Sequence, residues 1–209
     1  MTKRKIIPGI ILLATLGGCL GTAPPVPRDH FYRIQVEVTQ KPPARLPGTI
    51  SVSPIDAEGP MRERPMLFSV GDAHEIQQHD YHYWIETPPR MLQGQLVDFL
   101  RQSDAADSVV TPDLRLPADF EVTGRIRRFE RILRADATRV VVELELAMAD
   151  TGGKRLVVVQ SYGAEVPADD AGVEASVRAM DVALSDIFTR FLADAGIRSR
   201  EQRAAVGKD

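Results

Sequence analysis

The stretch that decides the fold is Phe120–Val166, FEVTGRIRRFERILRADATRVVVELELAMADTGGKRLVVVQSYGAEV. In its first part, apolar residues occupy every second position from Phe120 to Ile126, which is typical of a half-buried strand. The segment Arg127–Phe129 then shifts the phase of the alternation. A shift of this kind predicts a β-bulge or a bend within the strand.

The second part of this stretch repeats the strand pattern twice. Val140 to Met148 alternate between apolar and mostly polar positions. The sequence Asp150-Thr151-Gly152-Gly153-Lys154 predicts a hairpin turn, after which Leu156–Val166 returns as the next strand. The Gly-Lys pair is not a phosphate loop, because that motif needs a longer glycine frame ending in Lys-Ser/Thr before a helix. A β-meander therefore forms the centre of the predicted fold.

A long amphipathic helix is predicted beyond the meander. It follows Asp169-Asp170 and ends at Gly196, a residue type that favours helix ends. Residues 197–209 are predicted to be a polar, flexible tail. The apolar positions at helical spacing are Val173, Val177, Met180, Leu184, Ile187, Phe188 and Phe191.

A second helix and several short strands precede the meander. Thr87-Pro88-Pro89 predicts a helix start, with Thr87 as the cap. Strands are expected at Phe31–Val38 and Thr49–Val52, and a small hairpin at residues 66–76. The apolar stripe of the helix is Met91, Leu92, Leu96, Phe99 and Leu100.

These elements predict one α+β domain over residues 31–196. Its core is a mainly antiparallel or mixed sheet with two amphipathic helices on one face. The chain has 209 residues, 44% of them hydrophobic and 26% charged, which suits a single globular body. With 26 basic and 29 acidic residues, the composition speaks against nucleic-acid binding, which relies on clustered Lys and Arg.

The amino terminus is predicted to be an export signal followed by a lipid-attachment site. Residues 1–18 combine Lys3, Arg4 and Lys5 with a short apolar run that is too short to span a bilayer. Leu16-Gly17-Gly18-Cys19 resembles the lipobox of bacterial lipoproteins, and Cys19 is the only cysteine, so it cannot form an internal disulfide. Acyl chains on Cys19 would anchor the protein to a membrane.

Residues 19–30 are expected to form a lipidated cysteine with a Pro-rich tether. Leu20 takes the place where an Asp marks retention at the inner membrane of enteric bacteria. The resemblance to lipoproteins therefore implies a position on the periplasmic face of the outer membrane.

Three of the four histidines, His74, His79 and His82, lie within nine residues of one another. Imidazoles can bind metal ions, so a zinc site in a periplasmic enzyme is one interpretation. The other is a surface loop with incidental histidines, because the spacing matches no closed metal site. The sequence contains no Gly-x-Ser-x-Gly elbow and no cysteine beyond Cys19. We therefore expect no enzyme activity, no cofactor and no metal ion.

Two clusters are candidates for partner binding. Arg125, Arg127 and Arg128, with Arg131 and Arg134, could meet an acidic partner or lipid head groups, or could be the solvated charges of an edge strand. Tyr81, Tyr83 and Trp84 stand directly before the first helix. They could form an exposed docking patch, or could plug the core as a hydrophobic staple.

The order of these features resembles the ABC-type transport auxiliary lipoprotein family, which includes PqiC-like subunits of MCE-type intermembrane lipid transport systems. The resemblance covers about Phe31 to Leu192. Besides Cys19, it rests on the following segments and on their order: Phe31–Ile34, Ile50–Ile55, Arg64–Val70 with Gly71–Ile76, Tyr81 with Trp84 and Pro88, Phe129-Glu130, Asp150–Gly152 and the terminal helix.

The resemblance implies a non-enzymatic subunit anchored in the outer membrane. It would dock the outer end of an MCE-domain protein whose inner-membrane end is served by an ABC permease and ATPase. Lipid or another hydrophobic substrate would pass through the subunit or beside it. Some relatives form rings, so a homo-oligomeric ring is possible. A different outer-membrane assembly or secretion accessory lipoprotein would share the anchor and the size, and would differ in its partner.

Overall fold

A computed structural model describes residues 26–38, 45–135, 137–152 and 154–206. The predicted signal peptide, Cys19 and Leu20 lie outside the described residues. Within the described part of the chain, no helix combines the length and hydropathy needed to cross a membrane.

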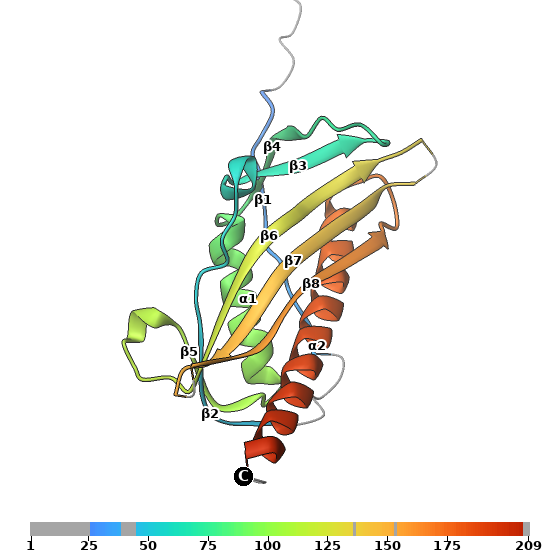
Figure 1. The fold of residues 1–209 in the computed structure, drawn as a ribbon. Coiled ribbons are helices and arrows are strands. Elements are labelled where there is room, and N and C mark those ends of the chain that lie inside the picture. Colours follow the sequence, from blue (N-terminus) through green and yellow to red (C-terminus); the bar gives the residue numbers. More distant parts are fainter. Residues whose placement is uncertain (1–25, 39–44, 136, 153, 207–209) are drawn as a thin grey trace, which may run out of the picture.

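The predicted meander forms the largest part of the sheet (Figure 1). Strands β6 (Phe120–Leu133), β7 (Arg139–Asp150) and β8 (Arg155–Pro167) pair antiparallel in sequence order. The register of β6 against β7 shifts between Ile126 and Arg128, which confirms the bulge predicted from the phase change. The alternating apolar residues of β7 point into the core.

The remaining strands extend the sheet on the far side of β6, and some of them are parallel to their neighbours. The described sheet has eight strands, in the order β1-β4-β3-β6-β2-β5, with β7 paired to β6 and β8 paired to β7. β6 pairs with β2 near its start and with β3 near its end, both in parallel. The bounds of these strands are β1 (His30–Tyr32), β2 (Leu46–Val52), β3 (Pro65–Val70), β4 (Gln77–Trp84) and β5 (Ala106–Val110). Short 3-10 turns occur at Gly59–Arg62 and Pro112–Leu114.

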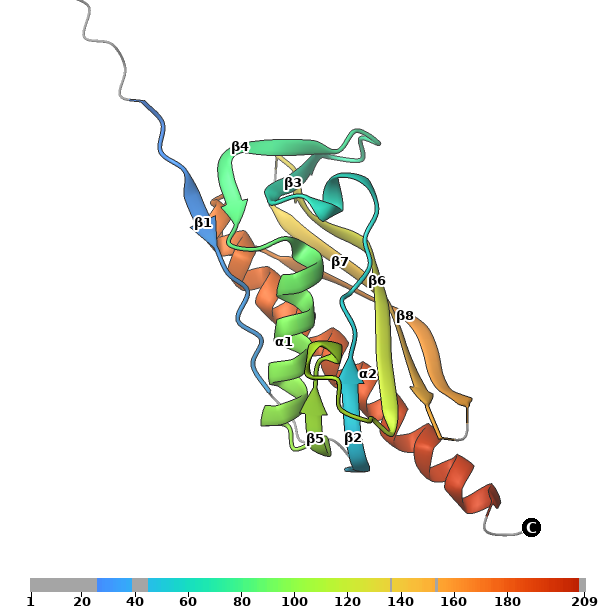
Figure 2. The ribbon, with the colours of Figure 1, turned by 90° about the vertical axis from the view of Figure 1, so that its left-hand side faces the viewer.

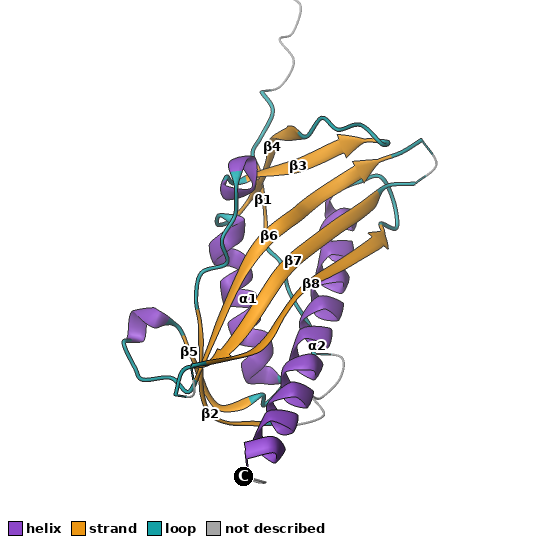
Figure 3. Cartoon of the chain, in the orientation of Figure 1, coloured by secondary structure: helices purple, strands orange, loops and turns teal. Residues whose placement is uncertain are grey.

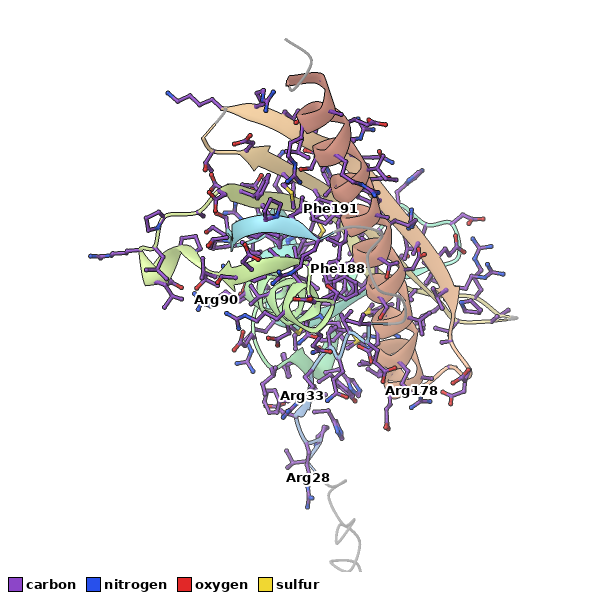
Figure 4. All side chains as sticks on the ribbon, turned by 90° about the horizontal axis from the view of Figure 1, so that it is seen from below. Arg28, Arg33, Arg90, Arg178, Phe188 and Phe191 are labelled. Carbon is purple, nitrogen blue, oxygen red and sulfur yellow. The ribbon has the colours of Figure 1, made fainter. Side chains whose placement is uncertain are left out.

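Two helices, α1 (Pro88–Gln102) and α2 (Val173–Val206), lie on one face of the sheet (Figures 2 and 3). Their apolar stripes meet each other and the sheet, with the rings of Phe99 and Phe188 5.7 Å apart. Phe188 and Phe191 extend from α2 into the interior (Figure 4). The structure therefore confirms the predicted single α+β domain with a mixed sheet and both helices on one side. Thr87 is the residue before α1, but its side chain makes no capping hydrogen bond.

Helix α2 does not end at Gly196 as predicted; it continues to Val206. Ala195 and Ser199 on either side of the glycine are buried, and the Gln202 side chain donates to the Leu156 carbonyl of β8 at 3.0 Å. These contacts outweigh the cost of about 1 kcal/mol for a glycine inside a helix. Residues 197–206 are therefore helical.

The predicted first strand, Phe31–Val38, is only partly a strand. Ile34 and Val36 are buried and their neighbours are exposed, as the alternation predicted. Only residues 30–32 pair with another strand, however. Residues 33–38 are extended but are held by helix side chains: the Val36 N–H donates to Gln95 Oε1 of α1 at 2.9 Å, and the Gln35 N–H to Asp181 Oδ1 of α2 at 2.8 Å.

The predicted hairpin at residues 66–76 exists, but its second strand begins later in the chain than predicted, at Gln77. β3 and β4 are antiparallel, and His74–Ile76 belong to the connection between them. His79 and His82 therefore lie on β4, and the interpretation of this segment as a surface loop is wrong. Cross-strand packing explains the difference, because the His79 ring lies 4.4 Å from the ring of Phe68 on β3.

Candidate functional site

Trp84 is a core residue. Its side chain is 1% exposed, and its ring lies 5.2 Å from that of Phe129. The core-plug interpretation is therefore right for Trp84, and a docking role for this ring is excluded by its burial.

The other aromatic residues of this segment lie nearer the surface. Tyr81 is 43% exposed and has a positive φ of 62°, which is uncommon for a residue with a side chain. Tyr83 is half-buried against Phe31, with ring centroids 5.8 Å apart. The guanidinium of Arg64 covers the other ring of this pair, 5.3 Å from the centroid of Phe31. The segment from residue 26 leaves the body at this end (Figure 1).

Most of the predicted arginine cluster is neutralised by nearby acids. Four of its arginines lie on β6, and Arg134 follows this strand. β6 pairs with β7 on one side and, at its two ends, with β2 and β3 on the other, so the interpretation as an edge strand is wrong. Each of the following arginines has a carboxylate within 4 Å: Arg125 with Asp56 and Glu58, Arg127 with Glu145, Arg128 with Glu130, and Arg134 with Asp72. The guanidinium of Arg127 lowers the pKa of Glu145 through their hydrogen bond. These side chains form local ion pairs rather than an uncompensated basic patch.

Arg131 differs from the rest of the cluster because it is buried, with 2% of its side chain exposed. Nε donates to Ser176 Oγ at 2.8 Å, and Nη2 donates to the Ala171 carbonyl at 2.8 Å. Nη1 lies 2.6 Å from His79 Nε2. Because arginine can only donate, His79 accepts this bond and carries its own proton on Nδ1. Arg131 thus ties β6 to β4 and to the start of α2.

The two histidines of β4 are neutral neighbours of this arginine. Burial, and then the charge of Arg131, lower the pKa of His79 to about 4. Burial also lowers the pKa of His82, whose Nδ1 lies 2.9 Å from the Tyr32 hydroxyl. The rings of His79 and His82 are 5.4 Å apart, so the structure brings together two of the three predicted histidines.

The predicted metal interpretation finds no geometric support in the described part of the chain. His74 is exposed in the connection between β3 and β4. Among the described residues, no group of three or more His, Cys, Asp or Glu side chains is arranged to hold a metal ion.

These side chains surround an open cavity of about 690 Å³ at the start of α2. β1 contributes Tyr32, β4 contributes His79 and His82, β6 contributes Arg131, and α2 contributes its first turn and Arg178. Its lining mixes hydrogen-bonding and charged side chains, the acids Asp170 and Glu174 among them, with apolar ones such as Leu133 and Val173, and such a mixture suits binding. Tyr32, Ser176 and Arg178 were not candidates in the sequence, because no motif links these distant segments.

Comparisons with known proteins agree with this fold. The family model for the ABC-type transport auxiliary lipoprotein component matches residues 32–190. No curated protein sequence matches the chain.

Solved structures show the same architecture at low sequence identity. Protein XCC0632 from Xanthomonas campestris superposes with a TM-score of 0.74 at 18% identity, over 84% of this chain and 99% of that one. A protein described as uncharacterized gives a TM-score of 0.61 at 14% identity, over 81% of this chain and 97% of that one. The hypothetical protein CT253 from Chlamydia trachomatis gives a TM-score of 0.50 at 10% identity, over 72% of this chain and 98% of that one. These likenesses concern the fold. The family match covers most of the chain, and the protein therefore belongs to the family of ABC-type transport auxiliary lipoprotein components.

Proposed function

We propose that the protein is a non-enzymatic subunit of an ABC/MCE-type transport system, anchored by lipid to the periplasmic face of the outer membrane. The observation that carries this proposal is the family match over residues 32–190. The subunit would hold the outer end of an MCE-domain protein in place while a permease and an ATPase act at the inner membrane. Its cargo would be lipids or other hydrophobic molecules.

The anchor in this proposal is Cys19, which the lipobox-like sequence Leu16–Cys19 supports. A single acyl chain binds a membrane only reversibly, whereas two or more acyl chains on the cysteine would give stable attachment to the membrane. Only six residues separate Cys19 from Val26, the first described residue. At about 3.1 Å per residue in a Pro-rich segment, this linker keeps the body within a few tens of ångströms of the membrane.

The position of the tether gives the body an orientation in this proposal. Residues 26–29 leave the molecule at the end where β1, β3 and β4 lie, and β2, β5 and the end of α2 lie at the opposite end (Figure 1). The first end would face the outer membrane, with Tyr81 and Tyr83 near the lipid surface. The opposite end would face the MCE-domain partner, and several copies could share that partner as a ring.

Replacement of the anchor tests the proposal. Cys19→Ala should leave the folded body unchanged and release the protein from membranes, as judged by circular dichroism and by fractionation of envelopes. The variant should also fail to complement transport in a strain that lacks the protein. Thr22→Ala, a change in the tether that spares the cysteine, is the matched control and should behave like the wild type. Full complementation by the released Cys19→Ala protein would refute the anchored role.

A further inference from the structure

The cavity at the start of α2 contains a buried positive charge with neutral partners. The three contacts of Arg131 are made to a hydroxyl, an imidazole and a carbonyl. His79 stays uncharged near neutral pH because its pKa is about 4. No carboxylate of the described residues lies within ion-pair distance of Arg131. A buried charge is costly unless an opposite charge compensates it, so the site lacks an anion.

The cavity also offers hydrogen-bond donors to such an anion. The three contacts leave two of the five N–H groups of Arg131 for a ligand. Val173, Glu174 and Ala175 line the same cavity with the first turn of α2, where backbone N–H groups have no partner within the helix. The dipole of a long helix favours negative charge at this position.

The charges at the rim of the cavity limit the charge of the ligand. Arg134 is paired with Asp72 at 2.6 Å. Arg178 lies 3.7 Å from both Asp169 and Glu174. Asp170 also lines the cavity and accepts a bond from the Gly172 N–H. Asp72 and Asp169 do not line the cavity and are exposed, so that solvent screens their charge. Among the residues that do line it, Arg134 and Arg178 balance Asp170 and Glu174. The single charge of Arg131 remains, and it matches a monoanion better than a dianion.

We propose that this cavity binds one phosphodiester group, the singly charged part of a glycerophospholipid head group. A volume of about 690 Å³ accommodates a head group of this size. The assignment of a lipid as the source of the phosphodiester rests on the proposed transport function. The anion site itself rests on Arg131 and its surroundings.

Calorimetric titration of the full-length lipidated protein in a neutral detergent tests the site. The probes are dihexanoylphosphatidylglycerol, dihexanoylglycerol, which lacks the phosphate, and dimethyl phosphate, which lacks the acyl chains. We expect the first probe to bind and the second not to bind above the detergent blank. Binding of dimethyl phosphate as tight as that of the lipid would keep the anion site but remove the lipid as its source.

Two variants decide whether the binding occurs in this cavity. Arg131→Gln should weaken the binding of dihexanoylphosphatidylglycerol at least tenfold, because it removes the charged donor. Ala171→Glu places a carboxylate at an exposed position beside Arg131 and should weaken binding several-fold. Ala204→Glu, exposed near the far end of α2, is the matched control and should bind like the wild type. If Arg131→Gln fails to fold, Ala171→Glu carries the test.

The absence of binding to the wild type would overturn the proposal, and so would equal binding by Ala171→Glu and Ala204→Glu. Neither result depends on an MCE-domain partner. A protein that co-purifies with its transport partners but binds no phosphodiester would therefore refute this site and leave the proposed function standing.

Discussion

At the scale of single residues, the arginines of β6 look equivalent in the sequence and differ in the folded protein. Arg125 and Arg127 each reach an acid at the surface and Arg128 reaches the buried Glu130, whereas Arg131 is buried against neutral groups. The sequence predicted a cluster of positive charge but could not show which arginine would be buried and which would pair with acids. The burial of Arg131 depends on α2 and β4, which contribute Ser176 and His79 from segments far along the chain.

Two titratable residues, His79 and Asp181, should change the free energy of unfolding with pH in opposite directions. The pKa of His79 falls from 6.5 to about 4 on folding. Between these values the unfolded chain binds more protons, so stability rises with pH. Burial raises the pKa of Asp181 from 3.8 to about 6, with Glu37 adding to the effect. Here the folded protein binds more protons, so stability falls as the pH rises through the same range.

Substitutions should separate these two contributions. His79→Gln should make the slope of unfolding free energy against pH more negative than in the wild type between about pH 4 and 6, and Asp181→Asn should make it more positive. Urea unfolding at several pH values in this range measures the slope. Parallel profiles for both variants and the wild type would show that neither group changes its pKa on folding.

At the scale of elements, the periodicity of apolar residues correctly predicted the features that depend on local sequence alone. The meander, its bulge and the stripes of both helices follow from alternation and helical spacing. Three features escaped prediction because tertiary contacts decide them. The histidine segment pairs with β3, α2 continues past Gly196 because β8 accepts Gln202, and residues 33–38 bond to helices instead of a strand.

The segment 33–38 depends on polar side chains of the helices for its backbone hydrogen bonds. Gln95→Met keeps the length of the side chain but removes the acceptor of the Val36 N–H. We expect a loss of about 1–3 kcal/mol in unfolding free energy, the cost of leaving a part-buried donor unpaired. Gln102→Met, at an exposed position of α1, is the control and should change stability little.

Denaturant unfolding measures this loss, and amide hydrogen exchange locates it. Exchange at Val36 should accelerate in Gln95→Met and stay unchanged in Gln102→Met. Equal stability and exchange in the two variants would show that the Gln95 bond does not hold the segment.

At the scale of the whole molecule, the family and the fold class were predictable and the cavity was not. The order of strands, turns and helices carried the resemblance, and the match over residues 32–190 confirms it. The cavity combines Tyr32, His82, Arg131 and the first turn of α2, which lie up to about 140 residues apart in the sequence. The strands among them are brought together in part by the parallel pairings of β1 with β4 and of β3 with β6. Those pairings leave no local pattern in the sequence.

The central claim is that the molecule positions a transport machine at the outer membrane. Its most direct test is purification of the tagged protein, with Cys19 intact, from detergent-solubilised envelopes, followed by mass spectrometry of the proteins that accompany it. The proposed role predicts an MCE-domain protein together with an ABC permease and ATPase. Recovery of an outer-membrane assembly or secretion partner without these components would contradict it.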